Sequence, residues 1–167
     1  IGSSELNNLQ FLSIAAKKKK PIILSTGMGN LKEVKNALKI IKKSGGKNLP
    51  VVVLQCTSQY PCPAKNINLN VIKTYQKNLK VDVGLSDHSL GFEAAICSAA
   101  LGAKVIEKHF TLNKNFKGPD HKASLHVKDL KNLIEMIKNT STMMGSFQKK
   151  PSTAELKIMP QVRRGIV

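Results

Sequence analysis

The sequence predicts an α/β fold built on a parallel β-sheet, and three observations lead to this prediction. Short apolar runs alternate with longer segments of helical periodicity. The runs begin near Ile22, Val51, Val81 and Lys104, and their separations of 29, 30 and 23 residues are typical of a strand plus a crossover helix. The runs are continuously apolar, as in strands buried on both faces. Both an open doubly wound sheet and part of a (β/α)8 barrel satisfy these observations.

The predicted elements follow in order along the chain. Residues 21–27 form the first predicted strand and residues 30–46 the first helix, with Asn30 as its N-cap. Gly45 and Gly46 end this helix, and its apolar face consists of Leu31, Val34, Leu38 and Ile41. The later elements are strands at 49–58, 81–88 and 103–110, helices at 68–79 and 91–102, and a last helix at 126–145 with Val127, Leu130, Leu133, Ile134 and Ile137 on one face.

The composition is that of one folded domain. The chain has 167 residues, 41% of them hydrophobic, which is enough to form a core. It has neither an apolar run of 18 residues nor a charged-then-apolar leader, so we expect no membrane association and a cytoplasmic location.

The three cysteines are predicted to be reduced thiols. Cys56, Cys62 and Cys97 are odd in number and show no CxxC spacing, which argues against a disulfide framework or a structural zinc site. Cys97 lies in the small-residue run "AAICSAALGA", so we expect it to be a buried packing residue.

The formal charge of +17 raises nucleic-acid binding as an alternative function. The excess consists of 25 lysines against two arginines, scattered along the helical segments, and only 4% of residues are aromatic. Arginine and aromatic side chains supply most bidentate and stacking contacts to nucleic acids. A solvated, lysine-rich surface is therefore the preferred interpretation, and we expect no nucleic acid as partner.

Polar residues follow each of the four apolar runs. They are "STG" at 25–27, "CTSQYP" at 56–61, "SDH" at 86–88 and "EKH" at 107–109. Single serines and threonines at such points are commonly helix caps. Four consecutive polar strand ends instead indicate a site, because the carboxyl ends of parallel strands meet at one edge of the sheet.

Two histidines stand at matching points of the last two strands. Because side chains alternate along a strand, Ser86 and His88 share one face opposite Asp87, and Glu107 and His109 share one face opposite Lys108. Strands about 4.8 Å apart and metal–imidazole bonds of about 2.1 Å allow one ion to join both histidines.

The donor set at the two histidines favours a divalent ion such as Mn²⁺ in an open, catalytic site, with Mg²⁺ or Co²⁺ as further options. The alternative is a helix turn at His88 and a satisfied buried histidine at His109. The loop "NKNFKGPDHKASL" then carries Asp120, His121 and Lys122 either over this site, as a lid, or simply into solvent.

Five motifs resemble one known family. "STGM", "CTSQYP", "GLSDHSLG", "VIEKHFTL" and "GPDHKASL" occur in the order and spacing of the N-acetylneuraminate (sialic acid) synthases, a family that includes legionaminic and pseudaminic acid synthases. The resemblance implies that residues 1–148 are the C-terminal half of a TIM barrel, its last four βα units. "RRGIV" resembles the lead into the family's antifreeze-like (SAF) domain, so residues 149–167 would be a linker toward that domain, and the chain a fragment.

The resemblance also implies a reaction. Phosphoenolpyruvate condenses with an open-chain N-acetylated hexosamine, here N-acetylmannosamine, to give a nonulosonic acid and phosphate; legionaminic or pseudaminic acid synthesis is the alternative. "GPDHKAS" resembles the sialic and legionaminic branch, which makes the 2,4-diacetamido-6-deoxy relative of N-acetylmannosamine a second expected acceptor. The full-length protein is expected to be a homodimer, and this half alone inactive.

The family's site residues carry over position by position. His88 and His109 match metal ligands. Ser3, Ser58 and Ser86 match positions that hold the phosphoenolpyruvate phosphate, although the family often has Asn or Thr in place of Ser58. Tyr60 and Asp120 match sugar-binding positions, and the candidate catalytic acids are Glu5, Glu107 and Asp120.

A half-barrel should expose the face that points toward the barrel axis. We expect Val51, Val53, Val83 and Val105 to lie on that face and to meet water in the isolated chain.

Overall fold

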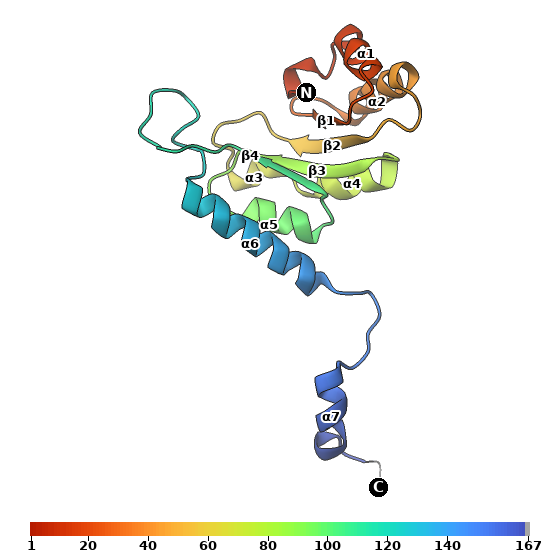
Figure 1. The fold of residues 1–167 in the computed structure, drawn as a ribbon, viewed down its shortest axis with the longest axis vertical. Coiled ribbons are helices and arrows are strands. Elements are labelled where there is room, and N and C mark those ends of the chain that lie inside the picture. Colours follow the sequence, from red (N-terminus) through yellow and green to blue (C-terminus); the bar gives the residue numbers. More distant parts are fainter. Residues whose placement is uncertain (166–167) are drawn as a thin grey trace.

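A computed structural model describes residues 1–165 of the chain. Its centre is a single parallel sheet in the order β1-β2-β3-β4 (Figure 1). The strands are β1 (Ile22–Ser25), β2 (Val51–Cys56), β3 (Asp82–Asp87) and β4 (Val105–Lys108), each starting within one residue of its predicted position. Strand neighbours in the sheet are also neighbours in the sequence, so every connection steps to the adjacent strand in the same direction.

The four predicted helices are present. They are α2 (Leu31–Gly45), α4 (Asn70–Asn78), α5 (Glu93–Ala100) and α6 (Val127–Met144). Helix α2 begins with a capping box, in which the Asn30 side chain accepts from the Glu33 amide and the Glu33 carboxylate accepts from the Asn30 amide. Gly46, at φ 101°, ends it in a conformation that favours glycine.

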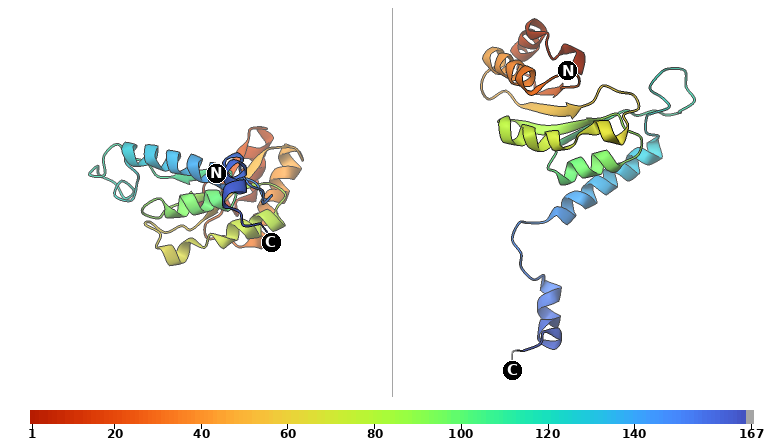
Figure 2. Two further views of the ribbon diagram at one scale, coloured as in Figure 1. Left: turned by 90° about the horizontal axis from the view of Figure 1, so that it is seen from below. Right: turned by 180° about the vertical axis from the view of Figure 1, so that it is seen from behind.

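Four helical segments were not predicted. They are the 3₁₀ turn η1 (Ser3–Glu5) and the helices α1 (Leu9–Lys17), α3 (Ala64–Ile67) and α7 (Thr153–Val162). Helix α7 stands apart from the rest of the chain after the segment 145–152, as two views show (Figures 1 and 2). It lies within the predicted linker 149–167, of which residues 166–167 are outside the described part; the division into 1–148 and 149–167 stays a prediction.

The hydrophobic core lies on one face of the sheet, between the strands and the helices. Leu24 from β1, Val53 from β2 and Val83 from β3 pack with Val34 and Ile41 from α2. A second cluster joins Ile106 of β4 to Ala95 of α5 and to Leu125 and Leu133. Helices on a single face fit a barrel wall and not an open doubly wound sheet, which carries helices on both faces.

The opposite face points toward the barrel axis, and there one sequence prediction is wrong. Val51, Val53 and Val83 are buried in the helix-side core and do not face inward. Side chains alternate along a strand, so Val83, three residues before the inward Ser86, points to the helix side. Val53 is paired with Val83 in the register and therefore points to the same side. The inward residues at these levels are Ile23, which is 42% exposed, with Val52, Leu54, Gly84 and Val105.

Cys97 was expected in the core and is instead exposed. Helix α5 buries Ala94, Ala95 and Ser98, which share one side of the helix, and Cys97 projects from the other side. Cys56 and Cys62 are buried free thiols, as predicted for reduced cysteines.

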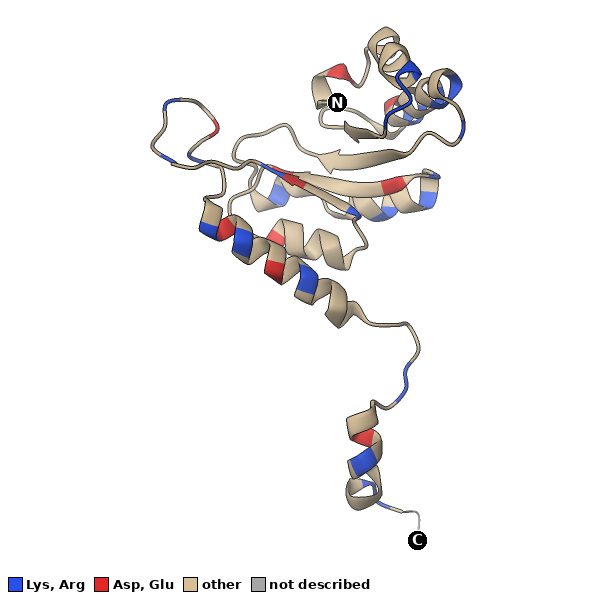
Figure 3. Ribbon diagram, viewed as in Figure 1, with Lys and Arg blue, Asp and Glu red and all other residues tan. Residues whose placement is uncertain are grey.

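Lysine and arginine positions are spread along the helices and loops of the ribbon (Figure 3). Blue positions occur on α1, α2, α4, α6 and α7 and in the loop between β4 and α6. None of the helices in residues 1–165 is long and apolar enough to span a bilayer.

Candidate functional site

Seven of the nine predicted site residues line a cavity of about 410 Å³ at the carboxyl ends of the four strands: Ser3, Ser58, Tyr60, Ser86, His88, Glu107 and His109. Each of the four strands contributes one inward side chain near its carboxyl end: Ser25, Cys56, Ser86 and Glu107. The parallel register aligns Cys56 with Ser86 and Ser86 with Glu107. The remaining lining comes from the segments around the strand ends: Gly2, Ser3, Ser4, Met28, Ser58, Tyr60, His88 and His109.

The two histidines face each other inside this cavity. The ring centroids of His88 and His109 are 5.3 Å apart with the rings nearly perpendicular, at 88°. Tyr60 packs against both rings, with centroids 4.0 Å from His88 and 5.5 Å from His109. The separation of the two imidazoles suits a shared metal ion, for which each metal–nitrogen bond is about 2.1 Å.

His88 is held in one tautomer by a backbone group. Its Nδ1 lies 2.8 Å from the Thr57 carbonyl oxygen, which can only accept, so Nδ1 donates and carries the proton. This leaves Nε2, 3.5 Å from the Ser86 hydroxyl, as the nitrogen with a free lone pair. A backbone acceptor on the far ring nitrogen is typical of metal-binding histidines.

A buried thiol lies beside His88. Cys56 Sγ is 4.0 Å from His88 Nδ1 and 3.5 Å from the Ser3 hydroxyl. Burial is the largest single influence on the pKa of Cys56 and raises it, but the hydrogen bonds with His88, Ser3 and Ser86 and the charge of His88 together lower this pKa below its usual value. Burial lowers the pKa of His88, yet its contacts with Cys56 and the Thr57 carbonyl raise it overall. The two groups therefore stabilise each other's charged forms.

Glu107 accepts hydrogen bonds from two serine hydroxyl groups of other strands. Its Oε1 accepts from Ser86 Oγ at 2.7 Å and from Ser25 Oγ at 3.4 Å, which links β4 to β3 and β1. The phenol of Tyr60 has a raised pKa, first because it is partly buried and then because Cys56, Asp120 and Glu107 place negative charge near it. Tyr60 therefore stays neutral and can act as a hydrogen-bond partner.

Two serines from the loops close the side of the cavity nearest β1. The Ser3 hydroxyl accepts from the Gly27 amide at 2.9 Å. A Cβ at position 27 would meet Ser58 Oγ and would come within 2.9 Å of Ser3 Oγ. Glycine at this position allows the end of β1 to approach both hydroxyls without either serine side chain having to rotate away.

Two predicted site residues lie away from the cavity lining. Asp120, with a side chain 52% exposed, sits in the loop between β4 and α6, and its Oδ2 is 3.7 Å from His109 Nδ1. Glu5, in η1, accepts from the Asn8 side chain at 2.8 Å and does not line the cavity. Their assigned roles stay predictions.

Sequence reasoning gave no individual site role to five lining residues: Gly2, Ser4, Ser25, Met28 and Cys56. Ser25 and Cys56 do belong to the polar strand ends that indicated a site. Ser25 and Cys56 could have been found from Ser86, which points inward. Paired residues of neighbouring parallel strands point to the same face, and side chains alternate along each strand, so the inward positions of β2 and β1 follow from Ser86. Met28 has φ 66° in the turn after β1, a backbone state that the sequence does not reveal.

Among residues 1–165, no three histidine, cysteine, aspartate or glutamate side chains are grouped closely enough to hold a metal ion. The cavity offers the imidazoles of His88 and His109 as a pair, with the Glu107 carboxylate in the same lining. Such a set leaves coordination positions for water and substrate oxygens, as catalytic sites require.

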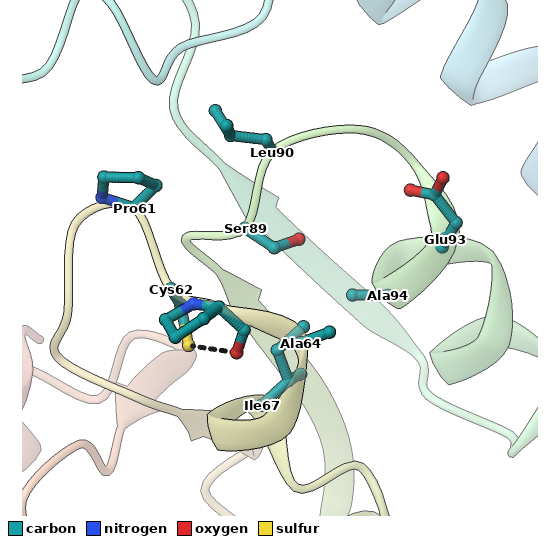
Figure 4. A pocket seen from close by; sticks show the side chains of 9 residues that line it. Pro61, Cys62, Ala64, Ile67, Ser89, Leu90, Glu93 and Ala94 are labelled. Atoms are coloured by element: carbon teal, nitrogen blue, oxygen red, sulfur yellow. Dashed lines mark hydrogen bonds between the residues drawn. The ribbon is translucent and has the colours of Figure 1, made fainter.

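A larger cavity, of about 590 Å³, lies outside the strand ends between the segments that follow β2 and β3 (Figure 4). Its lining is mostly apolar and includes Pro61, Cys62, Ile67 and Leu90. The one carboxylate there, Glu93, accepts from the Phe92 amide. Polar groups converge only weakly in this cavity, so the strand-end cavity is the candidate site.

The comparisons with known proteins agree with this geometry. The model of the NeuB family matches residues 1–149. The chain is 46% identical to the N,N'-diacetyllegionaminic acid synthase of Campylobacter jejuni, with 100% of this chain and 50% of that protein aligned. It is 43% identical to the enzyme of the same name from Legionella pneumophila, over 99% of this chain and 47% of that protein.

A solved structure shows the same fold. The crystal structure of N-acetylneuraminic acid (sialic acid) synthetase from Leptospira borgpetersenii, in complex with citrate, superposes with a TM-score of 0.86 at 30% identity. It covers 99% of this chain and 58% of that one. The chain thus spans about half the length of the curated relatives reported above, and its four strands form half of a (β/α)8 barrel. These matches and the strand-end cavity establish that the chain belongs to the NeuB family.

Proposed function

We propose that this chain forms the C-terminal half of the catalytic barrel of a phosphoenolpyruvate-dependent nonulosonic acid synthase. The observation that carries the proposal is the convergence of two imidazoles, one carboxylate and several serine hydroxyls at the strand ends of a NeuB-family barrel. Such a set can bind a phosphorylated, oxygen-rich substrate pair and exchange protons with it.

The acceptor that we propose is the 2,4-diacetamido-6-deoxy relative of N-acetylmannosamine, which would make the product legionaminic acid. Two curated relatives at 46% and 43% identity are diacetyllegionaminic acid synthases, whereas the sialic acid synthetase of known structure is 30% identical. This favours the legionaminic alternative over the N-acetylmannosamine that the motifs first suggested. The sequence "GPDHKAS" supports both sugars over the pseudaminic precursor.

The donor set fits a divalent metal ion, and Mn²⁺ is the ion that we propose. His88 Nε2 is free to coordinate because Nδ1 donates to the Thr57 carbonyl, and the ring of His109 is close enough to share the ion. When bound, the ion would supply a Lewis acid for the sugar aldehyde oxygen.

The chain's own residues have separate tasks in this proposal. The hydroxyls of Ser3 and Ser58 donate to the phosphate oxygens of phosphoenolpyruvate, and Ser86 donates to them when its hydroxyl turns away from Glu107. This turn leaves the Glu107 carboxylate without the Ser86 hydrogen bond, so Glu107 can take a proton from bound water. Tyr60, neutral and packed on both imidazoles, offers a flat apolar face and a hydroxyl to the sugar.

In its full-length form we propose that the protein works in the cytoplasm as a homodimer. Phosphoenolpyruvate and an N-acetylated hexosamine are its proposed small-molecule partners.

The test is to supply the full-length protein with phosphoenolpyruvate, Mn²⁺ and each of three sugars. The sugars are the 2,4-diacetamido-6-deoxy compound, N-acetylmannosamine and the altrose-configured pseudaminic precursor. We expect phosphate release and a nonulosonic acid by mass spectrometry, fastest with the first sugar. Turnover of only the pseudaminic precursor would overturn the acceptor assignment, and no turnover of any sugar would overturn the function.

A further inference from the structure

A buried ion pair lies directly behind the two histidines. Lys108 Nζ is 2.7 Å from Asp87 Oδ2, and the two side chains are 4% and 1% exposed. Asp87 and Lys108 are register partners in the parallel pairing of β3 and β4, on the helix-side face of the sheet. The ion pair therefore bridges the last residues of the two strands.

The next residues along the chain are the histidines themselves. His88 follows Asp87 and His109 follows Lys108, and both histidine rings line the cavity on the opposite face. A contact between residues 87 and 108 thus fixes the relative height of the two backbone positions from which the imidazoles project.

The same ion pair extends to the residue on the other side of His88. Asp87 Oδ1 accepts from the Ser89 amide at 2.8 Å and from the Ser89 hydroxyl at 2.6 Å. Lys108 Nζ also donates to the Ser89 carbonyl oxygen at 2.8 Å. His88 is consequently held between two residues that are both tied to Lys108, the residue before His109.

Stability alone does not account for such a pair. Desolvating two charges costs about as much as their attraction returns, and apolar replacements of a whole buried pair are often neutral. What an apolar pair would not supply is the directional set of hydrogen bonds around Ser89.

We propose that Asp87 and Lys108 are positioning residues, which hold the His88 imidazole at a fixed place and orientation relative to His109. The consequence of this inference, that metal affinity depends on the ion pair, rests on the proposed function, in which His88 and His109 hold the metal ion. Groups that hydrogen-bond the ring of a metal-binding histidine typically change metal affinity by about 10–100-fold when they are replaced. We expect an effect of this size from a pair that fixes the residues on both sides of His88.

The variant that tests the proposal removes both charges together. Lys108→Met alone would leave the buried Asp87 carboxylate unpaired and would endanger folding. The double variant Asp87→Asn/Lys108→Met leaves no buried charge, and the amide oxygen that it introduces would still offer Ser89 an acceptor. Lys108→Arg is the conservative variant, and Lys104→Met, an exposed lysine just before β4, is the matched control.

Two measurements on the full-length protein are decisive: the Mn²⁺ dissociation constant from electron paramagnetic resonance, and the cross-relaxation between the His88 and His109 ring protons in metal-free protein. We expect the double variant to melt cooperatively, to bind Mn²⁺ about 10–100-fold more weakly, and to lose the ring-to-ring signal. Lys108→Arg should retain much of the Mn²⁺ affinity and of the ring-to-ring signal, and Lys104→Met should match the wild type in both measurements. A folded double variant with wild-type affinity and ring signal would overturn the proposal.

The two readouts also separate this inference from the proposed metal site. If the wild-type protein binds no Mn²⁺ at these histidines, the metal assignment fails, while the ring-to-ring signal in metal-free protein still tests positioning. Its loss in the double variant alone would support the role of Asp87 and Lys108, and its retention would overturn it.

Discussion

The imidazoles of His88 and His109 differ in how firmly the chain holds them. His88 has a backbone acceptor at Thr57, a thiol at Cys56 and the ring of Tyr60 as neighbours. His109 has Asp120, 3.7 Å away and mostly exposed, as its charged neighbour. His88 is thus prearranged by the barrel wall, whereas the orientation of His109 depends on the loop between β4 and α6.

Replacing either histidine by alanine should abolish the binding of Mn²⁺ at the strand ends, because neither imidazole alone holds the ion. Isothermal titration of full-length His88→Ala and His109→Ala with Mn²⁺ checks this. His126→Ala is the control, since His126 is exposed at the start of α6 and its side chain makes no capping bond. Stoichiometric binding by the double variant His88→Ala/His109→Ala would show that the ligands were wrongly assigned.

Glu107→Gln should lower kcat by about 10²–10⁴-fold, the usual contribution of a general acid or base. The amide oxygen can still accept from Ser86, so the cavity should keep its shape while losing the group that takes a proton. Steady-state kinetics with phosphoenolpyruvate and the sugar give the measurement. The matched control Glu135→Gln, exposed on α6, should leave kcat unchanged; an equal kcat for Glu107→Gln would contradict the assignment.

At the scale of elements, β3 and β4 approach so closely that only glycine fits at position 84. A Cβ there would meet the carbonyl oxygen of Val105, a backbone atom that cannot move aside, and would lie 2.6 Å from Leu54 Cδ2. Leu54 is fully buried although it belongs to the inward face, because its side chain fills the space above Gly84.

Gly84→Ala should therefore separate β3 from β4 and lower the free energy of unfolding by about 1–3 kcal/mol, the usual cost of overpacking. It should also speed hydrogen exchange at the amides of β4. Gly2→Ala is the control, since a Cβ at position 2 has Ser4 Oγ as its nearest neighbour, at 4.0 Å. Denaturation and exchange profiles of Gly84→Ala that match those of Gly2→Ala would contradict the account.

Strands and long helices could be predicted from the sequence because each signal there repeats. Apolar runs at regular spacing located the strands, and the capping residues bounded α2 to within one residue. Two of the unpredicted elements are short, η1 with three residues and α3 with four, and short helices depend on packing and not on local preference. Length does not explain the other two, because α1 and α7 have 9 and 10 residues; α7 contains Pro160, which argues against a helix in the sequence.

The regular alternation of side chains along a strand predicted which strand residues line the candidate site. Residues outside the strands were predicted less well. Ser86, His88, Glu107 and His109 lie on strands or directly after them, and all four line the cavity as expected. Glu5 lies on a 3₁₀ turn, where the period of two gives no direction. The four valines expected to face the barrel axis were chosen by residue type and not by the alternation of side chains along each strand. Three of the four lie on the helix side of the sheet.

At the scale of the whole molecule, residues 1–165 form a sheet with two edges, at β1 and β4, and with helices packed on only one of its faces. Ile23 of β1 is exposed, as are Phe11 and Ile14 of the preceding helix α1. In a closed barrel, pairing with further strands satisfies such edges and covers such side chains.

Residues 1–167 expressed alone should therefore self-associate, because unpaired strands and exposed apolar side chains favour contacts between copies. Size-exclusion chromatography with light scattering, together with hydrogen exchange, measures this. We expect mixed oligomers and fast exchange in β1 and β4. A monodisperse monomer with strong protection in both edge strands would contradict the half-barrel account.

The most direct test of the central claim, that this chain is half of a nonulosonic acid synthase barrel, is the formation of the nonulosonic acid itself. Mass spectrometry would follow the product from phosphoenolpyruvate and the 2,4-diacetamido-6-deoxy sugar in three samples: the full-length protein, residues 1–167 alone, and residues 1–167 mixed with the remainder of the barrel. The account predicts product from the first, none from the second and recovery in the third. Product from residues 1–167 alone, or none from the full-length protein, would contradict it.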